Sequence, residues 1–167
     1  METKTILVVD NGETIRETVK KIMEREGYKV LCAEDGQAAV EILKGNCVNV
    51  ILSDIAMPRM DGNELLKLAK SIIPEVEVIL MTGHGKMEMG LEALQEGAFD
   101  FIQKPFTKLI LNKTVKQALE KQAMVVEMRH LKERVRELID EIMHLLGEPA
   151  SHQLDYPSGI LRANSTH

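Results

Sequence analysis

Polar side chains that could bind a metal ion or a phosphate stand at the ends of short apolar runs. These residues are Asp10, Asn11, Asp54, Thr82 and Lys104. In open parallel sheets, ligands bind beyond the carboxyl ends of the strands, so two carboxylates, an amide, a hydroxyl and an ammonium would meet in one shallow pocket. Adjacent carboxylates repel each other unless a cation or a proton lies between them, and oxygen ligands with room for water suit Mg²⁺. The pattern predicts a metal-dependent phosphate site.

This site depends on a sheet whose strands are joined by helices. Apolar runs and amphipathic stretches alternate along most of the chain, which is typical of an α/β fold with helices on both faces of a parallel sheet. The predicted strands are 5–10, 28–33, 48–54, 76–82 and 98–102. The predicted helices span about 13–26, 36–44, 62–72 and 86–96, and a fifth begins at 107. Gly27 and Gly97 stand where two of these helices should end, because glycine tolerates the positive φ found there.

Four motifs, taken in order along the chain, resemble a known family. They are ILVVDN, SDIAMPRMDG, VILMTGHG and GAFDFIQKPF. Over residues 4–122 they are similar to the receiver domain of two-component response regulators, and the last two are most similar to receivers of the nitrogen-regulation and nitrogen-fixation type. The resemblance implies a doubly wound, flavodoxin-like fold, in which a five-stranded parallel sheet in the order 2-1-3-4-5 is flanked by helices.

The resemblance also implies a role for each residue of the predicted site. Asp54 matches the aspartate that takes a phosphoryl group from the phosphohistidine of a sensor histidine kinase. Mg²⁺ would be bound by Asp10, by Asp54 and by the backbone carbonyl of Ala56. Lys104 would pair with one phosphoryl oxygen as a point charge, and the hydroxyl of Thr82 would donate to another. Such a protein is a phospho-acceptor that modifies itself, not an enzyme with a turnover substrate.

One position departs from the family pattern. The family usually has two consecutive acidic residues after the first strand, and here the second is Asn11, a metal ligand without negative charge. We expect weaker Mg²⁺ binding, because a unit charge about 4 Å from a divalent ion represents several kcal/mol at an effective dielectric near 20, before desolvation is subtracted. Slow phosphorylation or a partly active resting state would follow. The alternative is a degenerate receiver that serves as a phosphate-independent dimerisation or adaptor module.

The resemblance further implies a switch pair, Thr82 and Phe101. As Thr82 moves toward the phosphoryl group, the ring of Phe101 would turn inward and change the surface formed by the fourth helix, the fifth strand and the fifth helix. Ala56 and His84 match positions that influence how fast water removes the phosphoryl group. Pro105 matches a proline that follows a cis peptide bond.

The fifth helix is longer than a receiver domain needs. Neither proline nor glycine occurs from Thr107 to about Leu146, and seven apolar residues there alternate at spacings of four and three, which is typical of a coiled coil. They are Met124, Met128, Leu131, Val135, Leu138, Ile142 and Leu145. We expect a receiver domain at 1–122, a helical extension at 123–147 that joins two copies into a homodimer, and a disordered tail at 148–167. The alternative is a helix folded back on its own domain.

Composition limits the remaining possibilities. The chain has 167 residues and a formal net charge of −5 without a basic stretch, which argues against direct binding of nucleic acid. No apolar run approaches the roughly 20 residues of a membrane span. Cys32 and Cys47, without a leader sequence, indicate a reducing, cytoplasmic setting.

Two other classes of protein are disfavoured. In a flavodoxin-like cofactor binder, Asp10 and Asp54 would repel a bare phosphate, and an aspartyl phosphatase would need a second acid two residues after Asp54.

Overall fold

Strands and helices alternate through the part of the chain that the structure describes. The structure is a computed structural model, and it describes residues 3–83 and 87–147. The strands are Thr5–Val9 (β1), Lys29–Ala33 (β2), Val50–Asp54 (β3), Glu77–Thr82 (β4) and Asp100–Gln103 (β5). The helices are Glu13–Arg25 (α1), Gly36–Gly45 (α2), Gly62–Ile72 (α3), Met87–Gln95 (α4) and Lys108–Leu145 (α5). Each element lies within two residues of its predicted bounds.

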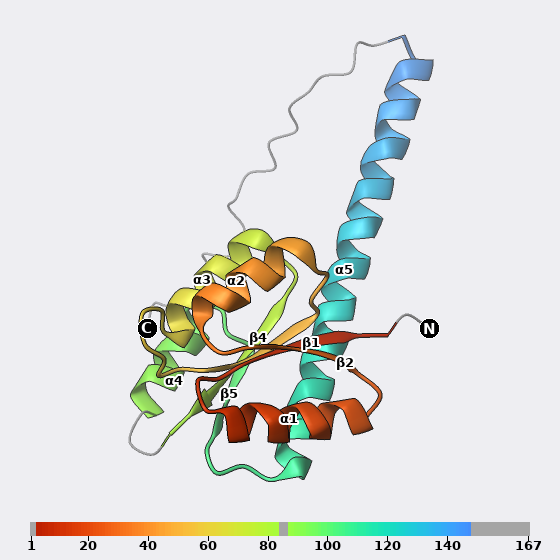
Figure 1. The fold of residues 1–167 in the computed structure, drawn as a ribbon. Helices are drawn as coiled ribbons and strands as arrows, with labels where there is room; N and C mark the ends of the chain where they lie inside the picture. The colour runs from red at the N-terminus through yellow and green to blue at the C-terminus, as the bar shows by residue number, and fades with distance from the viewer. Residues whose placement is uncertain (1–2, 84–86, 148–167) are drawn as a thin grey trace, which may run out of the picture. The chain divides into compact units, whose positions relative to one another are not determined.

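The strands form one parallel sheet in the order β2-β1-β3-β4-β5, which confirms the predicted fold class (Figure 1). Every residue of β1, β3 and β4 is buried, as expected for central strands with uninterrupted apolar sequences. Because the strands are parallel, their last residues lie at one end of the sheet, which we call the carboxyl end. Their first residues lie at the opposite, amino end.

Helices cover both faces of this sheet (Figure 1). On one face, α1 and α5 pack through the buried side chains Val19, Met23, Leu111, Val115, Ala118 and Leu119. On the other face, α2, α3 and α4 pack through Ala39, Leu43, Leu65, Leu66, Ala69 and Ala93. Full burial of one large aliphatic side chain contributes roughly 1.5–3 kcal/mol relative to exposure. The two layers therefore fix the strand ends on which the predicted site depends.

The fifth strand starts two residues later than the sequence predicts. The amide of Ala98 donates to the carbonyl of Ala93 at 2.9 Å, and Gly97 has a φ of 101°, so both residues form the turn that caps α4. Gly27, just beyond α1, has a φ of 90°. Both glycines therefore end helices, as predicted.

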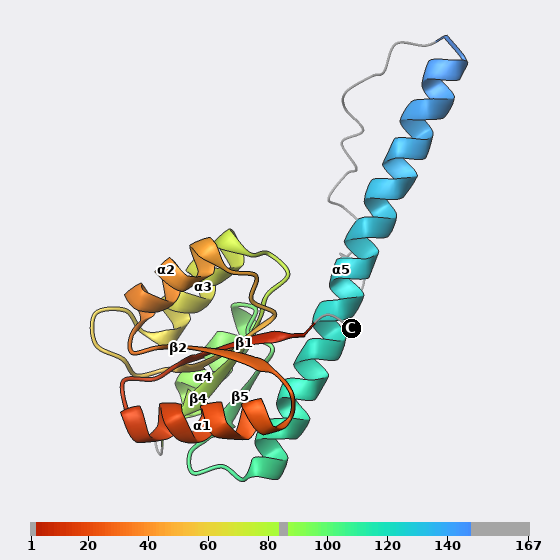
Figure 2. The ribbon, with the colours of Figure 1, turned by 45° about the vertical axis from the view of Figure 1, so that its right-hand side comes forward.

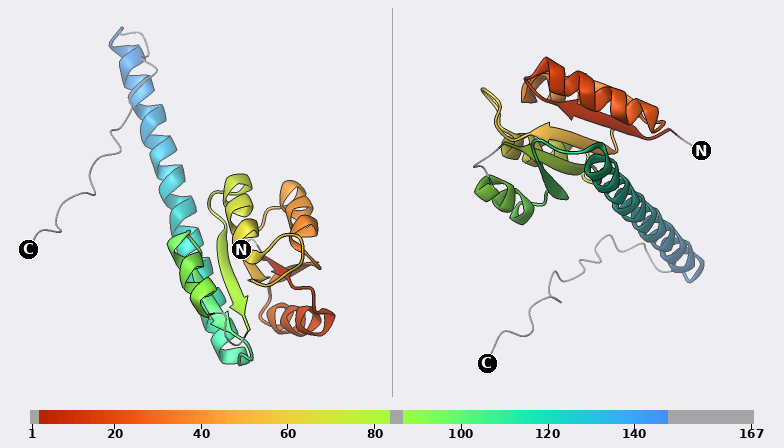
Figure 3. Two further views of the ribbon diagram at one scale, coloured as in Figure 1. Left: turned by 90° about the vertical axis from the view of Figure 1, so that its left-hand side faces the viewer. Right: turned by 90° about the horizontal axis from the view of Figure 1, so that it is seen from below.

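The last helix, α5, has 38 residues and is the longest of the described helices (Figure 2, Figure 3). The chain divides into two units, the first ending at Glu127 and the second starting at Met128. The predicted tail at 148–167 lies outside the described residues, the last of which is Gly147. Among the helices that are described, none is long and apolar enough to cross a membrane.

Candidate functional site

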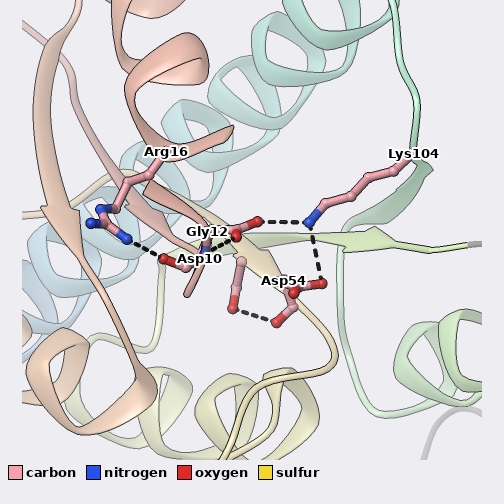
Figure 4. Close-up of polar contacts among 6 residues, drawn as sticks. Asp10, Gly12, Arg16, Asp54 and Lys104 are labelled. Carbon is pink, nitrogen blue, oxygen red and sulfur yellow. Dashed lines mark hydrogen bonds and ion pairs between the residues drawn. The ribbon is translucent and has the colours of Figure 1, made fainter. Parts of the chain in front are cut away.

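Two carboxylates and one ammonium meet at the carboxyl end of the sheet (Figure 4). Lys104 Nζ lies 2.7 Å from Asp10 Oδ2 and 3.5 Å from Asp54 Oδ1. Asp10 follows β1, Asp54 ends β3 and Lys104 follows β5, so three strands position the three charges. The side chains of Asp10 and Asp54 are only 2% and 12% exposed, so water screens their repulsion poorly. The structure thus brings together three of the predicted site residues.

Asp10 is held in place by all four of its polar atoms. Its amide donates to the carbonyl of Ala33 at 3.3 Å, and its own carbonyl accepts from Arg16 Nη1 at 2.5 Å. Its Oδ1 accepts from the amide of Gly12 at 2.8 Å, and its Oδ2 accepts from Lys104. Figure 4 shows Arg16 and Lys104 approaching Asp10 from opposite sides. The contact of Arg16 with Asp10 could not be predicted from the sequence, because one arginine in a helical turn carries no spacing signal.

Asp54 lacks full charge compensation. Burial raises the pKa of its carboxyl, the ammonium of Lys104 lowers it, Asp10 raises it again, and a hydrogen bond from the backbone of Ala56 lowers it. The balance is upward, and burial is its main cause. The two carboxylates also carry one more charge than the single ammonium of Lys104 can neutralise. A Cβ on Gly62 would lie 2.7 Å from the backbone oxygen of Asp54, which explains why α3 begins with glycine.

The backbone around Lys104 is tied to the end of β4. Its amide donates to the carbonyl of Thr82 at 2.7 Å. The peptide bond between Lys104 and Pro105 is cis, as the resemblance implies. Thr82 is the last residue of β4 and is 1% exposed, so it stands at the same end of the sheet as Asp54.

The two residues of the expected switch pair lie on one face of the sheet. Phe101 in β5 pairs with Leu80 in β4, and Thr82 stands two residues beyond Leu80, so both side chains project to the face covered by α4. Gly90 in α4 makes room for the ring, because a Cβ there would lie 2.9 Å from Phe101 Cγ. Gly90 was not among the predicted residues, although a glycine inside a helix is a usable sign of close packing.

The other residues predicted to bind the metal ion or to influence dephosphorylation lie near Asp10 and Asp54 or outside the described residues. Asn11 is exposed beside Asp10, Ala56 is half-buried two residues beyond Asp54, and His84 lies outside the described residues. No group of three His, Cys, Asp or Glu side chains within residues 3–83 and 87–147 could hold a metal ion. The available donors are instead two carboxylates, an amide and backbone oxygens. The two carboxylates, Asp10 and Asp54, already share the ammonium of Lys104. Such hard oxygen ligands fit Mg²⁺ better than zinc.

Comparisons with known proteins agree with this geometry. Residues 6–116 match the model of the response regulator receiver domain. The chain is 33% identical over 144 residues to the C4-dicarboxylate transport transcriptional regulatory protein DctD of Rhizobium meliloti, and the match covers 86% of this chain and 31% of DctD. It is 38% identical over 130 residues to the nitrogen assimilation regulatory protein NtrX of Azorhizobium caulinodans, covering 77% and 29% of the two chains.

A solved structure agrees as well. The response regulator receiver domain protein from Clostridium thermocellum matches with a TM-score of 0.70 and 32% identity, covering 73% of this chain and 98% of that one. The chain spans about a third of the length of DctD and NtrX. The match to NtrX confirms the predicted likeness to receivers of nitrogen regulation. The family follows from the ordered motifs, the sheet order and the match to the receiver model. The chain belongs to the response regulator receiver domain family of two-component systems.

Proposed function

We propose that this receiver domain accepts a phosphoryl group on Asp54 from the phosphohistidine of a sensor histidine kinase. An Asp54 carboxylate oxygen forms a bond to phosphorus, the bond from phosphorus to the histidine nitrogen breaks, and the imidazole leaves. The observation that carries the proposal is the single ammonium of Lys104 shared by Asp10 and Asp54. It supports the proposal because phosphoryl transfer asks the protein mainly for positioning and charge neutralisation.

Mg²⁺ fits this site as a second cation. Its ligands would be Asp10, Asn11, Asp54 and the backbone carbonyl of Ala56. The charge count supports this, because Asp10 and Asp54 present two negative charges and the ammonium of Lys104 neutralises only one of them. When bound, the ion supplies positive charge to the transferring oxygens. Lys104 would then pair with one phosphoryl oxygen and the Thr82 hydroxyl would donate to another.

The phosphorylated state would be read out on the face formed by α4, β5 and α5. Thr82 and Phe101 share that side of the sheet, and the ring of Phe101 packs directly on Gly90. Movement of Thr82 toward a phosphoryl oxygen would open space for the ring, and α4 would follow. Ala56 and His84 would influence how fast water removes the group.

The extended α5 is the second part of the proposal, since it would join two copies of the chain. We call its seven regularly spaced apolar residues the seam: Met124, Met128, Leu131, Val135, Leu138, Ile142 and Leu145. They are between 45% and 79% exposed, and a contiguous apolar stripe of this kind marks an interaction site. Val135 and Ile142 alternate with leucines along the seam, and β-branched residues at these positions favour two parallel strands.

The relatives suggest the setting in which the switch works. DctD is described as a transcriptional regulatory protein, and this chain corresponds to 31% of its length. We place a sensor histidine kinase upstream in the cytoplasm. We assign DNA contact to no residue of this chain, because its net charge of −5 does not favour binding to a polyanion.

Incubation with acetyl phosphate and Mg²⁺ tests the phosphoryl-transfer step. Mass spectrometry of the intact protein should show one added phosphoryl group, which chelation of Mg²⁺ should greatly reduce. Asp54→Asn should abolish the addition. Asp140→Asn is the matched control, since it removes a carboxylate from the exposed surface of α5, and it should leave the addition unchanged.

A degenerate receiver is the second candidate, and one observation favours it. Lys104 Nζ lies closer to Asp10 than to Asp54, and the neighbouring Asn11 adds no charge that would help a metal ion displace the ammonium. Such a receiver would act as a phosphate-independent dimerisation or adaptor module through α5. The same experiment separates the two candidates, because an unmodified wild-type chain would favour the degenerate receiver.

A further inference from the structure

A buried carboxylate lies at the amino end of the sheet, away from the site. Glu77, the first residue of β4, is 2% exposed, and its Oε2 lies 3.2 Å from Lys121 Nζ and 3.7 Å from Lys70 Nζ. Lys70 belongs to α3 and Lys121 to α5, which cover opposite faces of the sheet, so one carboxylate holds both helical layers. A buried carboxylate without a cation is strongly destabilising, so Glu77 holds its lysines firmly.

A second contact fastens the next residue of α5 to the same end of the sheet. Gln122 Oε1 accepts from Asn49 Nδ2 at 3.3 Å, and Asn49 Oδ1 accepts from the amide of Thr5 at 2.8 Å. Asn49 also accepts, through its carbonyl, from the amide of Glu77 at 3.1 Å. The two contacts therefore form one network, which we call the staple and define as Glu77, Lys70, Lys121, Asn49 and Gln122.

The staple sits where burial along α5 ends. Gln122 is the last buried residue of the helix, whereas Met124, the first residue of the seam, is 67% exposed. Full burial along α5 thus ends two residues before the seam begins.

Lys121 would belong to the seam if the staple did not hold it. It precedes Met128 by seven residues, and the same step leads on to Val135 and Ile142, so it occupies an equivalent position of the repeat. In a parallel dimer the two copies of Lys121 would face each other, and like charges in that position oppose pairing. In this structure the ammonium instead binds Glu77 and lies 5.5 Å from the centre of the Phe99 ring.

We propose that the staple sets the point on α5 at which contacts inside the domain give way to contacts with a second copy of the chain. By binding Lys121, Glu77 keeps a charge out of the seam, so that the contact between copies begins at Met124. This inference rests on the homodimer proposed above and gives it a residue-level boundary.

Sedimentation equilibrium of the full chain tests the inference through the dimer Kd. Glu77→Gln keeps the size of the side chain but removes its charge, and it should raise the dimer Kd about tenfold, because Lys121 is released toward the seam. Adding Lys121→Met to that variant should restore the wild-type Kd or improve on it. Lys70→Gln is the matched control. It removes the other cation of Glu77, so it should lower the unfolding midpoint and leave the Kd unchanged.

The outcomes distinguish the staple from the dimer itself. If wild type and Glu77→Gln are both dimeric with the same Kd, the staple is overturned and the dimer stands. A wild-type chain that is monomeric at every concentration overturns both, and leaves phosphoryl transfer to its own test. If Glu77→Gln does not fold, Lys121→Met decides, since the inference requires it to tighten the dimer and an unchanged or weaker dimer would refute it.

Discussion

Asp10 lies closer to the ammonium of Lys104 than Asp54 does, at 2.7 Å against 3.5 Å. A metal ion that binds Asp10 must therefore compete with a cation already in place. Receivers with two consecutive acids meet this competition with an extra charge, and Asn11 does not provide one. At the residue scale, the charge at position 11 should decide how well this receiver binds the proposed Mg²⁺.

Asn11→Asp should tighten Mg²⁺ binding by about tenfold or more, since a unit charge about 4 Å from a divalent ion represents several kcal/mol before desolvation is subtracted, and about 1.4 kcal/mol of net gain is already tenfold in affinity. Isothermal titration calorimetry of the chain with Mg²⁺ measures this change. Asn46→Asp is the matched control, because it makes the same change at an exposed residue just beyond α2. Equal affinities of wild type and Asn11→Asp would mean that position 11 does not contact the metal.

The burial of the Asp54 carboxyl should make the stability of the fold depend on pH. Burial raises the pKa of its carboxyl above the ordinary value of 3.8, so the folded state holds the proton more tightly than the unfolded state does. The stability that this group contributes is fully present below pH 3.8 and is lost as the pH rises through the raised value. At neutral pH, Asp54→Asn should therefore stabilise the fold by about 1 kcal/mol, the usual size of a single-site effect.

Urea unfolding of wild type and Asp54→Asn, at neutral pH and in acidic buffer, checks both the sign and the pH dependence. The advantage of the variant should shrink as the pH falls. Asp140→Asn, on the exposed surface of α5, should show no such trend. A destabilised Asp54→Asn at neutral pH would mean that the ion pair with Lys104 outweighs the burial of the carboxylate.

At the scale of elements, the strands and helices could be predicted because each depends on a local pattern of apolar residues. The apolar runs that became β1, β3 and β4 could be recognised because every residue in them is buried. The strand ends then place Asp10 and Asp54 together without further information. The contact of Gly90 with Phe101 and the pairing of Glu77 with Lys121 could not be predicted, because each joins residues with no fixed spacing in the chain.

The packing of α4 on β5 leads to the third prediction. Gly90→Ala should destabilise the fold by about 1–3 kcal/mol, because the added methyl group would lie 2.9 Å from Phe101 Cγ and force the ring to move. Thermal or urea unfolding measures the loss. Gly45→Ala is the matched control in a helix, because a Cβ there meets nothing within 4 Å. It should gain up to about 1 kcal/mol from helix propensity.

If Gly90→Ala is as stable as Gly45→Ala, the position of the Phe101 ring does not depend on the absence of a side chain at residue 90. The stepwise link from Thr82 to α4 would then need another route. If the variant is destabilised as expected, its rate of phosphorylation by acetyl phosphate shows whether the position of the ring is coupled to the site.

At the scale of the whole molecule, the proposed homodimer has an orientation that charged residues beside the seam can report. In a parallel coiled coil, some flanking residues pair across the two helices. The residue immediately before a core position such as Met128 lies beside the partner-helix residue whose number is five higher than its own. Glu127 and Lys132 have this spacing and carry opposite charges. Two attractive pairs would therefore flank the seam of a parallel dimer, whereas an antiparallel dimer would not bring these residues together in this way.

Reversing these charges one at a time tests the orientation. Glu127→Lys and Lys132→Glu should each raise the dimer Kd by about threefold to tenfold, because each places like charges at two contacts worth up to about 1 kcal/mol apiece. The double variant restores opposite charges and should recover the wild-type Kd. Sedimentation equilibrium at low salt measures the effect, which added salt should weaken. Glu133→Lys makes the same change away from the seam and should leave the Kd unaltered. Failure of the double variant to recover would contradict a parallel dimer, since only that orientation pairs position 127 of one copy with position 132 of the other.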